Sequence, residues 1–231
     1  MAVAQKRARS GQDRSVTFAF IRHGQTNWNR DDRLQGSSDI PLNDFGRQQA
    51  TDAIEVLAGT RWDAIVSSPL SRARETAEII AAGLGIELGP SYDELIERHY
   101  GDGEGATAEI IAERWPDHQY PGLESLDSVI ARAKVALDKI ASEYGSKNVI
   151  IVCHGSLIRY TLASLAGRPF DSIRNGSVAT FERVGAEWRV LTVNDEPVEA
   201  EAVEYEPAVA EAVEDQSVGH EPVVALENRS A

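Results

Sequence analysis

Two apolar segments of this chain end in the same dipeptide, His-Gly. Residues 16–21 lead to His23 and residues 148–153 lead to His154. Short, β-branched apolar runs that are bounded by glycine predict buried strands. In a parallel sheet the carboxyl ends of neighbouring strands share one edge, which is where open α/β sheets bind their ligands. We therefore expect an α/β fold that brings the two histidines together.

An arginine and a glycine flank the first histidine, in the order Arg22, His23, Gly24. A guanidinium offers a planar fork of donors to phosphate oxygens, and an imidazole can act as a nucleophile or carry a proton. An isolated Arg-His-Gly triplet is more often a strand that ends in a surface arginine and histidine. The choice between the two interpretations depends on the motifs that follow.

Periodicity along the rest of the chain predicts alternating strands and helices. A hairpin through Gly185 is expected to finish the sheet. The expected helices are 44–57, 70–82, 107–115, 125–144 and 157–165, and the further strands are 62–66, 86–88, 178–183 and 188–193.

The helix expected over 70–82 carries Arg72 and Arg74 in its first turns, where the helix dipole favours acidic residues. Two arginines against this preference suggest an anion that is held together with the helix N-terminus. Long arginine side chains that merely reach solvent explain the pattern equally well.

Charge divides the chain into a nearly neutral part and an acidic end. The formal charge is −14, which argues against nucleic acid or an anionic membrane as partner. Residues 195–231 hold eleven acidic residues and one arginine, a net charge of −10, so the rest carries only −4. We expect a disordered lead-in over 1–14, one domain over 15–194 and an acidic disordered tail over 195–231.

The single cysteine, Cys153, cannot form an internal disulfide, and this fits a reducing compartment. Neither a run of membrane-spanning length nor the apolar segment of a secretory signal is found in the sequence. We expect a cytoplasmic protein, and its oligomeric state stays open.

Four motifs together resemble the histidine phosphatase superfamily, the phosphoglycerate mutase-like family, and they follow the order of that family. They are RHGQTNWN at 22–29, SSPLSRARETA at 67–77, ELIERHYGDGEG at 94–105 and CHGSLIR at 153–159. The resemblance covers residues 16–194. It implies a three-layer αβα sandwich with a mostly parallel central sheet, and phosphoryl transfer through phosphohistidine without a metal ion or another cofactor.

The resemblance also implies roles for individual residues. His23 would be the nucleophile, Arg22 and Arg72 the clamps, and His154 a protonated second histidine on the transferring phosphoryl group. Glu97 would be the general acid and should be partly desolvated. The substrate contacts implied are Asn29, Gln35, Gly36, Arg98, Tyr100 and Gly155.

Physical chemistry adds two expectations to these roles. The attacking nitrogen of His23 must be unprotonated, which a backbone contact to the other ring nitrogen would ensure. The loop of Glu97 also offers rival acids, each of which taken singly is a solvated loop charge. These rivals are Asp93, Glu94, Asp102 and Glu104. Cys153 is expected to be a core residue, and His99 to be structural or exposed.

The motif ERHYG looks like that of the cofactor-dependent phosphoglycerate mutases, which makes a mutase the nearest alternative. Those enzymes carry an insertion after this loop with basic residues for a bisphosphate. Here the twenty residues 105–124 contain Arg114 as their only basic residue. We therefore favour a phosphatase for a small phosphorylated metabolite, whose leaving group stays open. A non-catalytic phosphate-binding protein ranks lower because every motif residue is present.

Overall fold

The computed structural model describes residues 15–185 and 187–198, which build a six-stranded sheet in the order β3-β2-β4-β1-β5-β6. The four strands from β3 to β1 are parallel, and β5 and β6 are antiparallel additions at one edge. The expected mostly parallel sheet is confirmed. Its strands are β1 (Val16–Arg22), β2 (Ala64–Ser67), β3 (Leu88–Ser91), β4 (Val149–Cys153), β5 (Val178–Val184) and β6 (Glu187–Val190).

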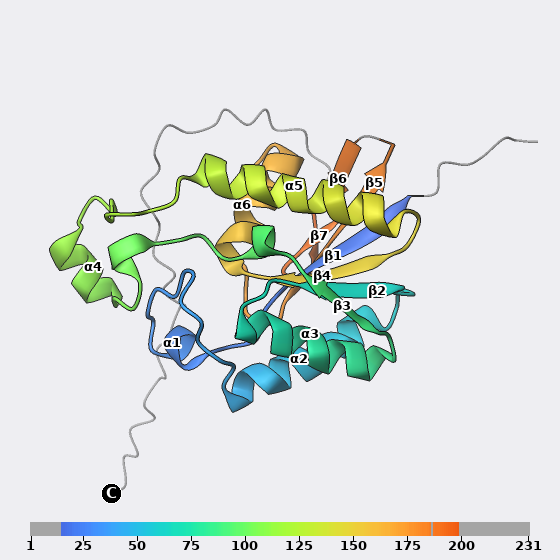
Figure 1. The fold of residues 1–231 in the computed structure, drawn as a ribbon, viewed down its shortest axis with the longest axis horizontal. Coiled ribbons are helices and arrows are strands. Elements are labelled where there is room, and N and C mark those ends of the chain that lie inside the picture. Colours follow the sequence, from blue (N-terminus) through green and yellow to red (C-terminus); the bar gives the residue numbers. More distant parts are fainter. Residues whose placement is uncertain (1–14, 186, 199–231) are drawn as a thin grey trace, which may run out of the picture.

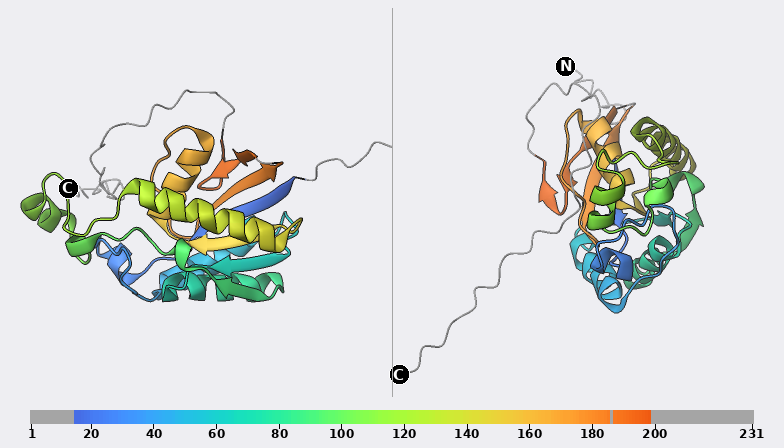
Figure 2. Two further views of the ribbon diagram at one scale, coloured as in Figure 1. Left: turned by 45° about the horizontal axis from the view of Figure 1, so that its top comes forward. Right: turned by 90° about the vertical axis from the view of Figure 1, so that its left-hand side faces the viewer.

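Helices cover both faces of the sheet and give three layers (Figures 1 and 2). On one face, α5 (Leu126–Tyr144) and α6 (Gly155–Ala166) pack against Phe18, Phe20 and their neighbours. On the other, α2 (Asp44–Leu57) and α3 (Ser71–Leu84) pack against Ala19 and Ile21. Successive side chains of β1 therefore point alternately into the two hydrophobic cores, as expected for a strand that is buried on both faces.

Shorter helices lie beyond the carboxyl ends of the parallel strands. These are α1 (Asn27–Arg30) and α4 (Ala108–Arg114), at the left of Figure 1, together with a single 3₁₀ turn at Gly101–Gly103. A second 3₁₀ turn, Asp93–Leu95, packs against α5. In the described part of the chain no helix is both long and apolar enough to cross a membrane.

The pairing of β1 with β4 brings the two His-Gly sequences side by side. Arg22 is paired with Cys153, and the next residue, His23, donates its backbone N–H to the Cys153 carbonyl at 3.0 Å. Because the strands run parallel and in this register, both histidines leave the sheet at the same edge. Cys153 is fully buried in the α5–α6 core, as expected.

Several boundaries differ from the sequence-based expectation. The expected strand 86–88 is β3 over Leu88–Ser91, and the bounds of β2 and α3 are shifted by one or two residues. Helix α6 begins at Gly155 rather than 157, with His154 as its N-cap. The expected strand 188–193 is divided, because after β6 the short strand β7 (Thr192–Val193) pairs with β8 (Glu196–Pro197) in a sheet of its own.

The described fold consequently extends past the expected boundary at 194. The Asp195 carboxylate accepts the Val178 N–H at 2.8 Å and pairs with Arg174 at 3.3 Å, which ties the segment to β5. The expected lead-in 1–14 and the rest of the expected tail, 199–231, lie outside the described residues.

The start of α2 touches the end of β1 through two glycines. A Cβ atom on Gly24 would lie 2.1 Å from the Gly46 carbonyl oxygen, and a Cβ on Gly46 would lie 2.1 Å from the Gln25 carbonyl oxygen. Backbone and not side chain sets these distances, so only glycine allows the approach. The contact fixes the segment that follows His23.

We predict that Gly46→Ala lowers the free energy of unfolding by about 1–3 kcal/mol, because overpacking outweighs the gain in helix propensity. The measurement is thermal unfolding, with an expected drop of a few degrees. Gly59→Ala is the matched control, since a Cβ there meets no atom within 4 Å. A midpoint that stays or rises in Gly46→Ala contradicts the prediction.

Candidate active site

His23 is held with its two ring nitrogens in different states. Nδ1 is 2.7 Å from the Gly24 carbonyl oxygen, and Nε2 accepts the Arg72 Nε–H at 3.1 Å. A guanidinium N–H can only donate and a carbonyl can only accept, so Nδ1 carries the proton and Nε2 carries a lone pair. The expected backbone contact is confirmed, and His23 is 2% exposed.

The surroundings of His23 also keep the ring neutral. Burial, followed by the charges of Arg72 and Arg22, holds the pKa of His23 well below its ordinary value, against the smaller effect of the Gly24 contact. The unprotonated Nε2 is therefore present at neutral pH.

Arg72 is fully buried in the first turn of α3. Its other nitrogens donate to the carbonyls of Ser38 at 2.7 Å and Gly36 at 2.8 Å. Burial lowers the pKa of Arg72 to about 10, with the charge of Glu97 opposing it, so the guanidinium stays charged at neutral pH. The solvent-reaching interpretation is wrong for Arg72. Arg74 turns away instead and donates to the Gly89 carbonyl at 2.7 Å.

Arg22, at the end of β1, forms a cluster with His23, Arg72 and His154. One terminal nitrogen donates to the Ile173 carbonyl, while Nε is buried without a partner in the described chain. A Cβ on Gly155 would lie 3.2 Å from this Nε, so the small residue at the start of α6 allows the guanidinium to approach the helix. Burial lowers the pKa of Arg22, and Glu97 opposes the shift.

His154 lies beside His23, with the ring centroids 5.1 Å apart. Its Nε2 is 2.8 Å from Ser68 Oγ, and its Nδ1 is buried without a partner in the described residues. Burial and the charges of Arg72, His23 and Arg22 hold the pKa of His154 well below its ordinary value. This shift favours the neutral imidazole in the unliganded site. The protonated His154 implied by the resemblance concerns the site with a phosphoryl group bound, and it stays a prediction.

Glu97 lies at the N-terminus of α6. Its carboxylate accepts the backbone N–H of Arg98 at 2.8 Å and those of Ser156 and Leu157 at 3.1 Å. The residue is 9% exposed, so the expected desolvation is confirmed. These three backbone donors hold the carboxyl group at the start of α6.

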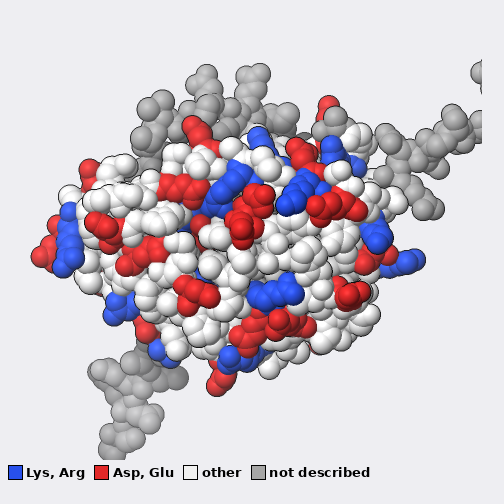
Figure 3. Space-filling view, in the orientation of Figure 1, with Lys and Arg blue, Asp and Glu red and all other residues white. Residues whose placement is uncertain are grey.

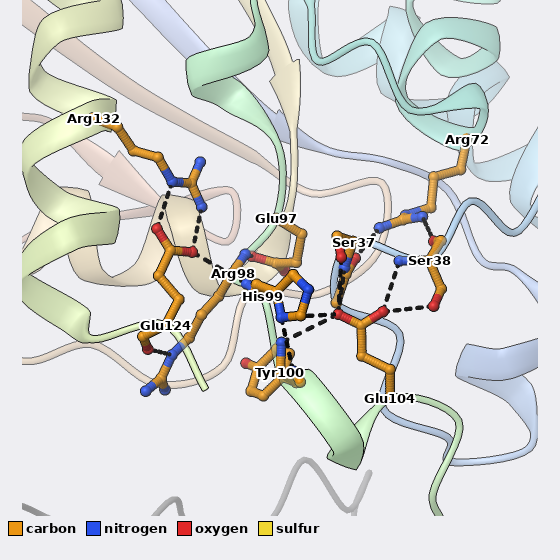
Figure 4. A network of polar contacts seen from close by, with 12 residues as sticks. Ser37, Ser38, Arg72, Glu97, Arg98, His99, Tyr100, Glu104, Glu124 and Arg132 are labelled. Carbon is orange, nitrogen blue, oxygen red and sulfur yellow. Dashed lines mark hydrogen bonds and ion pairs between the residues drawn. The ribbon is translucent and has the colours of Figure 1, made fainter. Parts of the chain in front are cut away.

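Glu104 links two loops beneath Arg72 (Figure 4). Its carboxylate accepts the backbone N–H groups of Ser37 and Ser38 at 2.9 Å and of Tyr100 at 3.2 Å, as well as both serine hydroxyls. Its side chain is only 13% exposed, so the expectation of a solvated loop charge is wrong for this residue. Burial raises the pKa of Glu104, but these hydrogen bonds together bring it below its ordinary value.

The loop segment 36–38, which Glu104 holds, also holds Arg72. The backbone carbonyls of Gly36 and Ser38 accept hydrogen bonds from the Arg72 guanidinium. Gly36 has a φ of +55°, and a Cβ there would lie 2.2 Å from Glu104 Oε1. Among the other rival acids, Asp93 and Asp102 are exposed as expected, and Glu94 is partly exposed near Lys139.

The implied phosphate contact Asn29 lies close to His23. Its Oδ1 accepts the Thr26 N–H at 3.2 Å in the capping box of α1 and approaches Asn175 Nδ2 at 3.3 Å. Gln35 is buried and accepts the Thr26 hydroxyl at 2.8 Å.

Sequence reasoning missed Asn175, whose Nδ2 donates to the His23 carbonyl at 2.9 Å. The residue lies in the irregular segment before β5, where neither periodicity nor a recognised motif marks it.

Arg98 and Tyr100 are buried, and their polar groups contact other residues of the chain. Arg98 Nε donates to the Glu124 carbonyl at 2.8 Å, and its guanidinium lies 5.4 Å from the centre of the Tyr100 ring. The Tyr100 hydroxyl is 2.7 Å from Ser156 Oγ, and burial raises the pKa of Tyr100. Two nitrogens of the Arg132 guanidinium donate to the Glu124 carboxylate and so hold Glu124 in place beside Arg98 (Figure 4). His99 is exposed, as expected.

A groove of about 1210 Å³ adjoins the cluster where Arg22 lines it. Asn29, Arg33, Tyr120 and Asn175 line it as well, with side chains of both charges. The groove offers room and polar groups for a leaving group next to the arginine.

The cluster lacks acceptors for its buried donors. Within residues 15–185 and 187–198, the buried side-chain polar atoms without a partner are Arg22 Nε, His154 Nδ1 and Ser67 Oγ. Two of these three belong to the cluster, and leaving such groups unpaired is costly. An oxyanion would satisfy them, since its oxygens accept hydrogen bonds and its charge matches the guanidinium groups.

The sequence model of the histidine phosphatase superfamily (branch 1) matches residues 18–196. This chain belongs to that superfamily. The uncharacterized phosphatase PhoE of Bacillus subtilis is 38% identical over 183 residues, which cover 78% of this chain and 94% of the relative. The phosphoglycerate mutase-like protein 4 of Arabidopsis thaliana is 36% identical over 195 residues, covering 77% and 84%.

A solved structure of mycobacterial glucosyl-3-phosphoglycerate phosphatase in complex with VO3 has the same fold. Its TM-score is 0.70 at 30% identity, and the match covers 78% of this chain and 98% of the other. The expected phosphoglycerate mutase-like fold of this histidine phosphatase is thus confirmed.

We predict that this histidine phosphatase loses stability as the pH falls from 6.5 to 5. His23 and His154 have pKa values well below 6.5 in the folded chain. The unfolded chain therefore binds protons in this window that the folded chain does not, and each histidine contributes a slope of up to about 1.4 kcal/mol per pH unit.

Urea unfolding at several pH values measures this slope. His154→Gln should remove about half of it, because only one of the two buried histidines then remains. An unchanged slope in His154→Gln contradicts the prediction.

We predict that Glu104→Gln costs about 1–3 kcal/mol of unfolding free energy, because an amide NH₂ would face backbone donors. Arg72 should be misplaced as a result, lowering kcat/KM about ten- to a hundredfold. Asp102→Asn is the control, since this acid of the same loop is exposed. Equal effects of the two substitutions on both quantities would refute the role of Glu104.

Proposed function

We propose that this histidine phosphatase hydrolyses small phosphomonoesters through a phosphohistidine formed on His23. The observation that carries the proposal is the neutral His23 with its Nε2 lone pair, held beside a charged and buried Arg72. Phosphoryl transfer requires such a nucleophile together with cations around the equatorial oxygens.

In the first step, His23 Nε2 bonds to phosphorus as the bond from phosphorus to the ester oxygen breaks. Arg22, Arg72 and His154 would donate hydrogen bonds to the three non-bridging oxygens. The buried Arg22 Nε and His154 Nδ1, which lack partners in the described chain, support this assignment. Because these donors are already in place, little reorganisation is needed as charge moves onto the oxygens.

Glu97 would give a proton to the leaving ester oxygen. In the free site three backbone N–H groups hold its carboxyl group at the start of α6, close to Arg22 and Arg72. In the second step the resulting carboxylate takes a proton from water, whose oxygen attacks phosphorus and releases inorganic phosphate from His23.

The leaving group would lie along the groove beside Arg22, with Asn29 at its edge. Gln35, Gly36 and Gly155 act in this proposal through Thr26, Arg72 and Arg22, which they contact or accommodate. Arg98 and Tyr100 support the corner of Glu97 and Ser156 rather than extend into open space.

A phosphoglycerate mutase is the less favoured function. The described segment from Gly105 to Glu124, which includes α4, has Arg114 as its single lysine or arginine. A bisphosphate cofactor needs further cations in that region. A purely phosphate-binding role would not require the unprotonated Nε2 of His23.

The proposed partner is a small phosphorylated metabolite in the cytoplasm. On the face shown in Figure 3, basic and acidic side chains alternate over α5, without the extended basic surface that binds nucleic acid. The buried, unpaired thiol of Cys153 suits a reducing compartment.

We predict that the protein releases phosphate from one or more phosphomonoesters with a chelator present, and does not interconvert 3- and 2-phosphoglycerate. His23→Ala should lower kcat at least about 10³-fold. Asp102→Asn is again the control, since this exposed acid lies in a loop near the site.

Two measurements test this prediction. One is the release of phosphate from a panel of phosphomonoesters, and the other is a coupled assay of mutase activity. Interconversion without release would favour the mutase, and absence of both would favour a binding protein. Substantial turnover by His23→Ala would exclude His23 as the nucleophile.

A further inference from the structure

We propose that Ser68 is a positioning residue that sets the proton on His154. Its hydroxyl donates to Nε2, so that Nδ1 carries the only ring proton and presents it to the phosphoryl group. The last part of this inference rests on the proposed function, whereas the position of the proton does not.

The hydrogen-bond partners of Ser68 determine which atom donates in its contact with His154. Ser68 Oγ lies 3.3 Å from the Leu70 backbone nitrogen and 2.8 Å from His154 Nε2. The Leu70 N–H can only donate, so it uses one lone pair of the hydroxyl oxygen. The hydroxyl hydrogen then needs an acceptor, and His154 Nε2 is the one within hydrogen-bond distance among the described residues.

The reverse direction leaves more groups unpaired. If Nε2–H donated to Ser68, the hydroxyl hydrogen would have no acceptor in the described chain, and Nδ1 would keep an unpaired lone pair. Ser68 and His154 are both 0% exposed, so bulk water does not compensate. Burying unpaired polar groups is costly, which favours Ser68 as the donor.

The same proton position suits an oxyanion. With the proton on Nδ1, His154 provides a buried N–H that waits for an acceptor, as Arg22 Nε does nearby. With the proton on Nε2, the Nδ1 lone pair would instead repel the phosphoryl oxygens. The packing of Ser68 and the chemistry of the ligand therefore require the same tautomer.

This role matters because His154 is neutral in the unliganded site. Burial and the two arginines keep its pKa well below the ordinary value. An imidazolium would donate through both nitrogens whatever Ser68 did, but a neutral ring donates through one alone. Ser68 thus decides whether the second histidine can contact the phosphoryl group at all.

Ser67 provides a matched control within the same motif. It is also 0% exposed, but its Oγ has no partner in the described residues. Ser67→Ala and Ser68→Ala remove the same atom from adjacent buried positions, and only the second removes a contact to His154.

The first test is ¹⁵N NMR of the histidine rings in the full chain at neutral pH, with His154 assigned from the spectrum of His154→Gln. We expect a proton on Nδ1 and a lone pair on Nε2. Ser68→Ala should shift His154 toward the Nε2–H tautomer, and Ser67→Ala should not. A wild-type His154 that is protonated on Nε2, or on both nitrogens, overturns the proposal whatever the activity.

The second test is steady-state turnover of the best phosphomonoester. Ser68→Ala should lower kcat/KM about ten- to a hundredfold through the loss of one aligned donor, while Ser67→Ala stays near wild type. A changed tautomer with unchanged kcat/KM overturns the functional part of the proposal. The expected tautomers in a protein that turns over no ester would support the role of Ser68 and contradict the proposed function instead.

Discussion

The parallel pairing of β1 with β4 is the constraint on which the site depends. Its register places Arg22 opposite Cys153, so that His23 and His154 both follow strand ends at one edge of the sheet. A shift of one residue would turn the alternate side chains of β1 into the wrong core, because Phe18 and Ala19 belong to opposite faces. Burial of both faces of β1 thus fixes the active-site geometry. The position of the histidines is a consequence of core packing and needs no separate stabilising contact between them.

Once the strands are paired, the cluster must accommodate cations in a region with little solvent. Backbone carbonyls of Gly36, Ser38 and Ile173 accept the guanidinium donors, and the charge of Glu97 opposes the effect of burial on both arginines. Both imidazoles stay neutral, since a further positive charge would not be compensated. In the free site the two guanidinium groups lie beside neutral imidazoles, and Arg22 Nε has no acceptor among the described residues. The site is therefore polarised for an anion before any anion binds.

The sequence was sufficient for features that depend on local pattern. Apolar runs and helical spacing predict the strands and helices of an α/β fold. The resemblance carried by the four motifs implies the three layers and a single site with Arg22, His23, Arg72, His154 and Glu97. It was insufficient where a contact joins distant loops. Glu104 looks like a surface acid until the loop of Ser37 and Ser38 is folded against it. Asn175 shows no periodic signal, and the neutrality of His154 depends on burial beside two arginines, which no single segment reveals.

The proposed substrate site has a phosphate half and a leaving-group half, which are built from different kinds of structure. The phosphate half comes from strand ends and helix starts, where Arg22, His23, Arg72 and His154 are fixed by the sheet and its flanking helices. The groove beside it is lined largely by loops and short helices, including Arg33 and Tyr120, that are held by fewer core contacts. Loops can change in sequence at little cost to the fold. A chain of this kind can therefore keep its phosphoryl chemistry while its leaving-group specificity changes, which accounts for one fold in relatives named as phosphatases and as mutase-like proteins.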